Sequence, residues 1–172
     1  MQQIRNLIRA VPDFPSAGVI FRDITPLLAD AGAFARCVDL LAEPWLGMDV
    51  QAVCAIEARG FILGAALARR LDAGFVPLRK PGKLPPPVIG VEYELEYGRD
   101  RLEAGADALP AATRVLIVDD VLATGGTLEA AHTLVGRLGA RVLGASVLIE
   151  LIALRGRERW ANEAPLHALL RY

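Results

Sequence analysis

The fold of this chain is decided by one stretch, Val115-Leu116-Ile117-Val118-Asp119-Asp120-Val121-Leu122-Ala123-Thr124-Gly125-Gly126-Thr127. Its first four residues form a continuous apolar run, which is typical of a strand buried on both faces of a parallel sheet. Two carboxylates follow directly, and a loop of small residues then leads into a segment with helical periodicity. We therefore expect a strand–loop–helix unit with its functional groups at the carboxyl end of the strand, where open α/β sheets bind ligands.

The loop of small residues has the chemistry of a phosphate site. Its two glycines lack Cβ, so successive backbone N–H groups and the following helix N-terminus can point at one anion. The loop holds no lysine, which distinguishes it from a P-loop. Asp119 and Asp120 would repel a phosphate unless they met a cation or hydroxyl donors, and a ribose diol with Mg²⁺ supplies both. The sequence therefore predicts a sugar phosphate ligand, with Mg²⁺ as cofactor.

Similar patterns on both sides of this unit predict the fold class. Apolar runs alternate with segments of helical periodicity, which indicates α/β architecture with a mostly parallel sheet flanked by helices. We expect strands at 50–56, 75–78 and 142–149 and helices at 61–71 and 128–138. Nearer the N-terminus we expect a helix over 2–11, ended by Pro12, and a second helix that begins after Asp30.

The segment from Arg79 to Asp107 departs from this pattern. It holds no apolar run, and from Val91 to Tyr97 apolar residues alternate with glutamates, as in a half-exposed strand. A connection this long is unusual in a compact domain and favours a functional lid, although a hairpin without a function is the alternative. Arg79, Lys80 and Lys83 at its start form a basic cluster that suits a polyanionic group.

Composition limits the class of protein. A chain of 172 residues with 53% hydrophobic residues fits one globular domain and excludes a disordered chain. The net charge of −1 argues against a nucleic-acid partner. No apolar run approaches the roughly 18 residues of a membrane span. The two cysteines form no paired motif and no secretory signal is evident, so we expect a cytoplasmic protein.

Residues 115–127 closely resemble the motif with which type I phosphoribosyltransferases bind 5-phosphoribosyl 1-pyrophosphate (PRPP). Four further segments resemble the adenine phosphoribosyltransferase family: 14–23, 57–61, 78–85 and 95–98. The resemblance covers most of residues 12–150. It implies the type I phosphoribosyltransferase fold in a single domain, 1–172, with a small N-terminal hood over about 1–34 and a long flexible lid loop over about 79–107.

The resemblance also implies roles for the matched positions. The residues that hold the 5′-phosphate of PRPP are Ala123, Thr124, Gly125, Gly126 and Thr127. The residues that bind pyrophosphate are Arg59, Arg79, Lys80 and Lys83, and those that bind adenine are Ile20, Phe21, Arg22 and Leu151. The catalytic residues are Glu96, which accepts the proton lost by adenine, with Asp119 and Asp120 facing the ribose hydroxyls. Tyr97 helps to close the lid. Mg²⁺ is held mainly by substrate oxygens and water, so no protein ligand is assigned to it.

The implied activity is that of a glycosyltransferase of the pentosyltransferase class, an adenine phosphoribosyltransferase that converts adenine and PRPP to AMP and pyrophosphate in purine salvage. Two alternatives stay open: a phosphoribosyltransferase for xanthine, guanine or hypoxanthine, and a PRPP-sensing regulator without catalysis. The presence of Glu96 and the lack of a basic patch favour the enzyme. We expect a homodimer, with no nucleic-acid or membrane partner.

Overall fold

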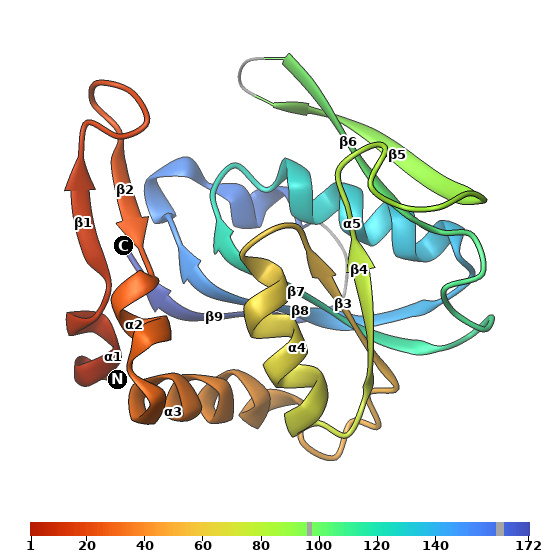
Figure 1. The fold of residues 1–172 in the computed structure, drawn as a ribbon, viewed down its shortest axis with the longest axis horizontal. Helices are drawn as coiled ribbons and strands as arrows, with labels where there is room; N and C mark the ends of the chain where they lie inside the picture. The colour runs from red at the N-terminus through yellow and green to blue at the C-terminus, as the bar shows by residue number, and fades with distance from the viewer. Residues whose placement is uncertain (96–97, 161–163) are drawn as a thin grey trace. The chain divides into compact units, whose positions relative to one another are not determined.

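The computed structural model describes residues 1–95, 98–160 and 164–172. The chain forms two compact units, Met1–Leu40 and Leu41–Tyr172, and each is described by itself (Figure 1). The elements that begin in the first unit are α1 (Gln2–Asn6), β1 (Arg9–Pro12), β2 (Ile20–Asp23), α2 (Thr25–Ala29) and α3 (Ala31–Ala42). None of the helices among the described residues has the length and apolar character that crossing a membrane requires.

The first unit corrects one expectation. The helix predicted over 2–11 ends at Asn6, and Arg9–Pro12 instead forms strand β1, paired antiparallel with β2. Backbone pairing to residues 20–23 replaces the helical hydrogen bonds that residues 9–12 would have made, and nothing local in the sequence marks that partner. The prediction at Asp30 is confirmed, because its Oδ1 accepts a 2.9 Å hydrogen bond from the N–H of Ala33 in the first turn of α3.

The second unit is built on a five-stranded parallel sheet with the order β4-β3-β7-β8-β9 (Figure 1). The α/β class with a mostly parallel sheet flanked by helices is therefore confirmed. Its elements are η1 (Glu43–Trp45), β3 (Ala52–Ile56), α4 (Gly60–Arg70), β4 (Gly74–Leu78), β5 (Val88–Leu95), β6 (Gly98–Gly105), β7 (Arg114–Leu122), α5 (Gly126–Arg137), β8 (Arg141–Glu150), η2 (Ile152–Leu154), η3 (Gly156–Arg159) and β9 (Leu166–Arg171).

The two helices α4 and α5 cover opposite faces of the sheet. A Cβ added at Gly64 of α4 would lie 2.3 Å from the Cβ of Ala55, so α4 packs closely on the face to which Ala55 points. Cys54 and Ile56, which point to the other face, belong to the buried cluster that includes Leu128 and Leu134 of α5. All five residues of β3 are buried as a result.

The order of the strands places a switch point between β3 and β7. The chain leaves β3 through α4 to reach β4 on one side, whereas it leaves β7 through α5 to reach β8 on the other. The loops after β3 and β7 therefore diverge and leave a crevice at the carboxyl edge of the sheet, where such sheets bind ligands.

The long segment after β4 folds as a hairpin of β5 and β6, paired from Val88↔Gly105 to Leu95↔Gly98. The sequence indicated the first of these strands but not the second. Val91, Leu102 and Ala104 are buried in the same cluster as α5, so the base of the hairpin is packed against that helix (Figure 1).

Two strands differ from expectation: β7, at the end of the 115–127 motif, and β9, near the C-terminus. Strand β7 continues to Leu122, so Asp119 and Asp120 lie within its last residues and not beyond it. Strand β9 was not predicted. Its residues Leu166–Arg171 alternate poorly, and pairing with β8 determines their conformation.

Candidate active site

Asp119 and Asp120 lie beside the switch point, and Arg59 approaches Asp120 from the turn that follows the neighbouring strand, β3. Arg59 precedes α4, the helix that follows β3, and its Nε lies 2.9 Å from Oδ2 of Asp120. Asp120 is only 5% exposed, whereas Asp119 is half-buried and lines a pocket. The ion pair therefore connects the carboxyl ends of β3 and β7.

Both carboxyl groups are shifted toward the protonated form. Burial raises the pKa of Asp119 well above its ordinary value, and the adjacent negative charge of Asp120 adds to that effect. Burial also raises the pKa of Asp120, although the positive charge of Arg59 opposes the shift. A cation or a pair of hydroxyl donors brought to this place would stabilise the ionised pair.

Gly60 allows α4 to begin directly against the end of β7. A Cβ at this position would lie 2.9 Å from Oδ1 of Asp119 and 3.2 Å from the carbonyl oxygen of Val118. From the sequence alone, Gly60 has no predicted role beyond its place in the matched segment 57–61. In the structure, its missing side chain sets how closely the Arg59 loop approaches Asp119.

The predicted phosphate loop forms a small pocket with Asp119. The pocket has a volume of about 60 Å³, and its lining includes Ala123, Thr124, Gly125 and Thr127. Gly125 has a φ of +86° and is the N-cap of α5, a conformation that L side chains rarely adopt. The loop thus turns sharply into the helix N-terminus, which suits an anion. Gly126, the fifth predicted residue, is buried as the first residue of α5.

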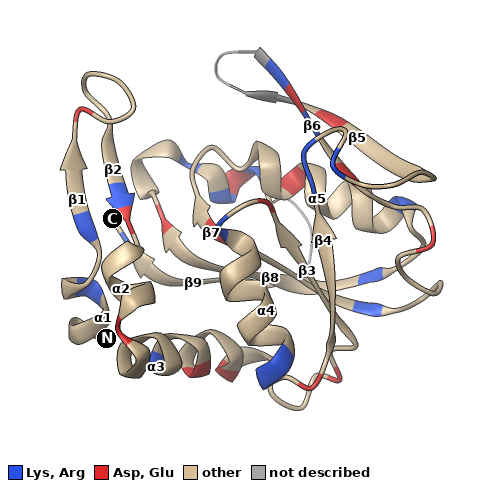
Figure 2. Ribbon diagram, in the orientation of Figure 1, with Lys and Arg blue, Asp and Glu red and all other residues tan. Residues whose placement is uncertain are grey.

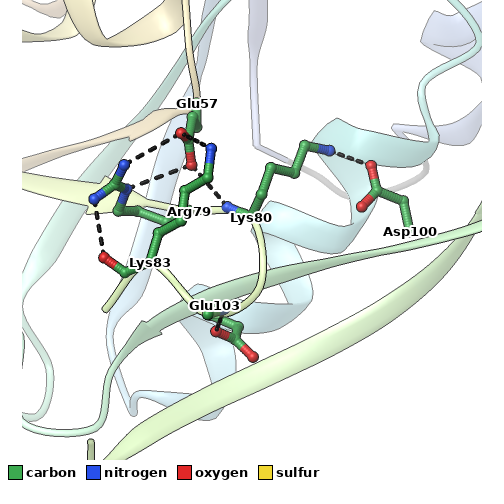
Figure 3. A network of polar contacts seen from close by, with 7 residues as sticks. Glu57, Arg79, Lys80, Lys83, Asp100 and Glu103 are labelled. Atoms are coloured by element: carbon green, nitrogen blue, oxygen red, sulfur yellow. Dashed lines mark hydrogen bonds and ion pairs between the residues drawn. The ribbon is translucent and has the colours of Figure 1, made fainter. Parts of the chain in front are cut away.

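Arg79 and Lys83 meet at Glu57, the first residue after β3 (Figure 3). Lys83 Nζ donates to Glu57 Oε1 at 2.8 Å, and Arg79 Nη2 donates to the same oxygen at 3.2 Å. The backbone N–H of Lys80 donates to Oε2 at 2.9 Å. The hydrogen bond from Lys83 lowers the pKa of Glu57 to about 2; burial opposes the shift, and Arg79 and Lys80 reinforce it.

The side chain of Lys80 points away from Glu57 and toward the hairpin (Figure 3). Its ammonium group pairs with Asp100 of β6 and donates to the hydroxyl of Tyr93 of β5 at 2.8 Å. The basic cluster that the sequence predicted is thus assembled, but each of its members is bound to a carboxylate. The sequence indicated neither Glu57 nor Asp100 as partners, because these contacts join residues 20 or more positions apart.

Basic and acidic residues are interleaved on the hairpin and on the turn that precedes it (Figure 2). Arg101 Nε lies 2.9 Å from Oε1 of Glu103, and the other oxygen of Glu103 accepts a 3.1 Å hydrogen bond from the N–H of Gly82. Glu103 is only 7% exposed. The turn at Gly82 is thereby attached to the hairpin through one buried carboxylate.

The residues predicted to bind adenine lie in both units. Ile20, Phe21 and Arg22 are consecutive on β2 of the first unit, where Phe21 contacts Phe14 edge-on with ring centroids 5.2 Å apart. Leu151 follows β8 in the second unit and is half-buried. Glu96 and Tyr97 lie outside the described residues. Among the residues that are described, no three His, Cys, Asp or Glu side chains are grouped so as to hold a metal ion.

Comparisons with known proteins identify relatives along nearly the whole chain. The model of the phosphoribosyl transferase domain family matches residues 33–163. An adenine phosphoribosyltransferase of Xanthomonas campestris pv. campestris is 59% identical over 165 residues, which cover 96% of this chain and 89% of the relative.

Solved structures give the same picture. The adenine phosphoribosyltransferase of Thermoanaerobacter pseudethanolicus superposes with a TM-score of 0.96 at 47% identity, over 99% of each chain. That of Saccharomyces cerevisiae, solved with adenine and an imino-altritol bisphosphate, gives a TM-score of 0.92 at 39% identity, over 98% of this chain and 97% of its own. The chain has the type I phosphoribosyltransferase fold and belongs to the adenine phosphoribosyltransferase family.

Proposed function

We propose that this chain transfers the 5-phosphoribosyl group of PRPP to adenine, giving AMP and pyrophosphate in purine salvage. The observation that carries the proposal is the pocket that the phosphate loop and Asp119 line together. An anion cradle beside a carboxylate pair suits a ligand with a phosphate at one end and hydroxyl groups near it. PRPP has that chemistry, and membership of the family supports adenine as the acceptor.

Residues 123–127 hold the 5′-phosphate of PRPP through backbone N–H groups and the hydroxyls of Thr124 and Thr127. Asp119 and Asp120 face the ribose hydroxyls, which donate to the carboxylates and favour their ionised form. When the bond from C1 to pyrophosphate breaks ahead of attack, the ribose ring gains positive charge. Fixed carboxylates nearby stabilise that transition state more than the ground state.

Pyrophosphate is held by Arg59, Arg79, Lys80 and Lys83. Glu57, Asp100 and Asp120 form ion pairs with these four cations, and the pairs restrict where the cationic side chains lie. A pyrophosphate group carries more charge than one carboxylate and can compete for the same donors. We infer that the ion pairs rearrange when PRPP binds.

Mg²⁺ fits the chemistry of this site. Burial raises the pKa of both carboxyl groups, so a nearby positive charge would favour their ionised forms, and magnesium is commonly bound together with substrate phosphates. Substrate oxygens and water would hold the ion, and Asp119 and Asp120 on this edge would contact it largely through that water, so no direct protein ligand is assigned. The ion would supply positive charge to the developing pyrophosphate oxygens.

Adenine loses the proton on its attacking ring nitrogen as the new C1–N bond forms. We propose that the carboxylate of Glu96 accepts that proton, and that Tyr97 closes the lid of residues 79–107 over the substrates. Closure excludes water, which would otherwise hydrolyse PRPP. Phe21 stacks on the adenine ring, and the backbone around Ile20 and Arg22 reads its edge. Leu151 covers the other face of the ring.

The remaining proposals concern the domain organisation, the oligomeric state and the location of the protein. We propose that residues 1–34 act as a hood within a single catalytic domain, and that the chain works as a homodimer in the cytoplasm. The dimer is tested by sedimentation. A mass near twice 18.4 kDa is expected, and a mass near 18.4 kDa would contradict it.

A panel of purine bases tests the activity directly. Purified protein is incubated with PRPP, Mg²⁺ and adenine, guanine, hypoxanthine or xanthine in turn, and the nucleotide products are separated by chromatography. We expect AMP from adenine as the dominant product. Turnover only with the 6-oxopurines would overturn the choice of base, and no turnover with any base would overturn the activity.

A further inference from the structure

The phosphate loop is supported from behind by the short helix η3. A Cβ added at Gly156, the first residue of η3, would lie 2.1 Å from the carbonyl oxygen of Ala123 and 2.8 Å from the N–H nitrogen of Gly125. The contact is reciprocal, because a Cβ at Gly125 would lie 2.3 Å from the carbonyl oxygen of Gly156. Two backbone segments thus meet with no room for a side chain between them.

Arg157 fixes η3 to the sheet. Its guanidinium donates to both oxygens of Glu150, from Nε to Oε1 at 2.8 Å and from Nη2 to Oε2 at 2.7 Å. Its third donor, Nη1, reaches the carbonyl oxygen of Leu166 at 2.8 Å. Glu150 is the last residue of β8 and is only 6% exposed, and Leu166 begins β9. One planar side chain therefore ties the residue next to Gly156 to two strands.

Trp160 attaches the other end of η3 to α5. Its ring meets His132 of α5 edge-on with centroids 5.3 Å apart, and its Nε1 donates to the carbonyl oxygen of Ala164 at 2.7 Å. Trp160 is 8% exposed and belongs to the core cluster. Arg157 and Trp160 thus attach η3 to the sheet and to α5, the helix that begins at the phosphate loop.

We propose that Gly156 and Arg157 are positioning residues for the 5′-phosphate of PRPP, with η3 as the rear wall that sets the conformation of residues 123–127. This inference rests on the proposed function for the identity of the ligand. A phosphate cradle made of backbone N–H groups depends on the orientation of each peptide, because hydrogen bonds weaken steeply as their geometry departs from linear. Neither residue touches the ligand in this account.

The sharpest variant is Gly156→Ala. The φ of Gly156 lies outside the left-handed region, so alanine meets no backbone strain there and acts only through its Cβ. The atoms that this Cβ would meet belong to the backbone of the phosphate loop and cannot rotate away. The matched control is Gly136→Ala in α5, where a Cβ would meet nothing within 4 Å.

Arg157→Gln removes the guanidinium, and Arg157→Lys keeps the charge but not the two-pronged contact. The control for both is Arg171→Gln, because Arg171 also pairs with Glu150, at 3.2 Å, without being adjacent to Gly156. If η3 had only a structural role, Arg157→Gln and Arg171→Gln would both lower the melting temperature. Neither variant would then change the Kd for ribose 5-phosphate relative to the other.

Two readouts decide the proposal. The first is calorimetric binding of ribose 5-phosphate and, separately, of pyrophosphate. We expect Gly156→Ala and Arg157→Gln to raise the Kd for ribose 5-phosphate by about 10- to 100-fold, the range that corresponds to loss of a hydrogen bond to a charged group, with a smaller rise for Arg157→Lys, and to leave the Kd for pyrophosphate unchanged. The second is amide hydrogen exchange at residues 123–127 of the ligand-free protein, which we expect to be faster in the same variants and unchanged in both controls.

Wild-type Kd and wild-type exchange in folded Gly156→Ala would overturn the proposal, as would equal effects of Arg157→Gln and Arg171→Gln. If Gly156→Ala does not fold, Arg157→Lys is judged on the same two readouts. Failure of the wild-type protein to bind ribose 5-phosphate would instead count against the proposed function. The exchange measurement needs no ligand and would still support or overturn the role of η3.

Discussion

Arg59 and Asp120 join the two strands on either side of the switch point, with Nε of Arg59 2.9 Å from Oδ2 of Asp120. Under the proposed function, the pair influences the charge of the two carboxylates that would face the ribose. The positive charge of Arg59 is the strongest influence that opposes the burial of Asp120, and without it the pKa of Asp120 would rise further.

Arg59→Gln should therefore move the acid limb of the pH–rate profile to higher pH. The reaction needs the ionised carboxylates, and a higher pKa means that they ionise only at a higher pH. The variant should also raise the KM for PRPP, since it removes one proposed pyrophosphate contact. The profile of kcat/KM for PRPP between pH 5 and 9 measures the first effect.

The control for this variant is Arg114→Gln. Arg114 also pairs with an aspartate, Asp49, but it lies at the opposite end of β7 from Asp120. Its profile should coincide with that of the wild-type protein. If the profile of Arg59→Gln coincides with those of the wild type and Arg114→Gln, Arg59 does not control the ionisation of Asp119 and Asp120.

Glu57 should contribute stability that depends on pH. Its folded pKa of about 2 lies below the ordinary value of 4.5, so its contribution is present above about pH 4.5 and is lost as the pH falls toward 2. Glu57→Gln should reduce the free energy of unfolding at pH 7 by about 1 kcal/mol, less than the shift alone implies because Arg79 and Lys83 are partly exposed. Urea unfolding at pH 7, 5 and 3 measures the difference.

The difference in free energy of unfolding between the wild type and Glu57→Gln should become smaller as the pH falls. Glu158→Gln is the comparison, because the pair of Glu158 with Arg155 is largely exposed and should contribute little at any pH. A constant difference for Glu57→Gln across the three pH values would mean that its carboxylate is not stabilised by the cations around it.

The phosphate loop and the ion pairs around Glu57 show what could and could not be predicted from the sequence. The strand at 115–118, the phosphate loop and α5 are encoded locally, by an apolar run, glycines and helical periodicity, and the structure has all three. The pairing of Arg79 with Glu57 is not encoded locally, since the two residues meet only because β3 and β4 are neighbours in a parallel sheet.

The same distinction explains the errors in secondary structure. Residues 9–12 continue a helical pattern but pair with residues 20–23, and residues 166–171 show no strand pattern but pair with β8. In both cases a backbone partner elsewhere in the chain outweighs a local preference, as is common for strands. Of the predicted site, Arg59, Asp119, Asp120 and the loop at 123–127 are brought to one edge of the sheet.

Glu96→Gln should lower kcat by about 100-fold or more while PRPP still binds, because the amide cannot accept the proton that adenine loses. Steady-state kinetics with adenine varied, together with the Kd for PRPP, separates the two effects. Glu92→Gln is the control, since Glu92 is an exposed residue of β5 with no proposed role. An unchanged kcat in Glu96→Gln would remove Glu96 as the proton acceptor.

The most direct measurement of the whole account is phosphorus NMR of the reaction with wild-type protein and with the double variant Asp119→Asn/Asp120→Asn. With adenine, PRPP and Mg²⁺, the wild type should convert the PRPP signals to those of AMP and pyrophosphate in equal amounts. The double variant should do so at least about 100-fold more slowly, because it lacks the charges that stabilise the ribose in the transition state. PRPP that stays intact with the wild type, or a double variant that works at the full rate, would contradict the account.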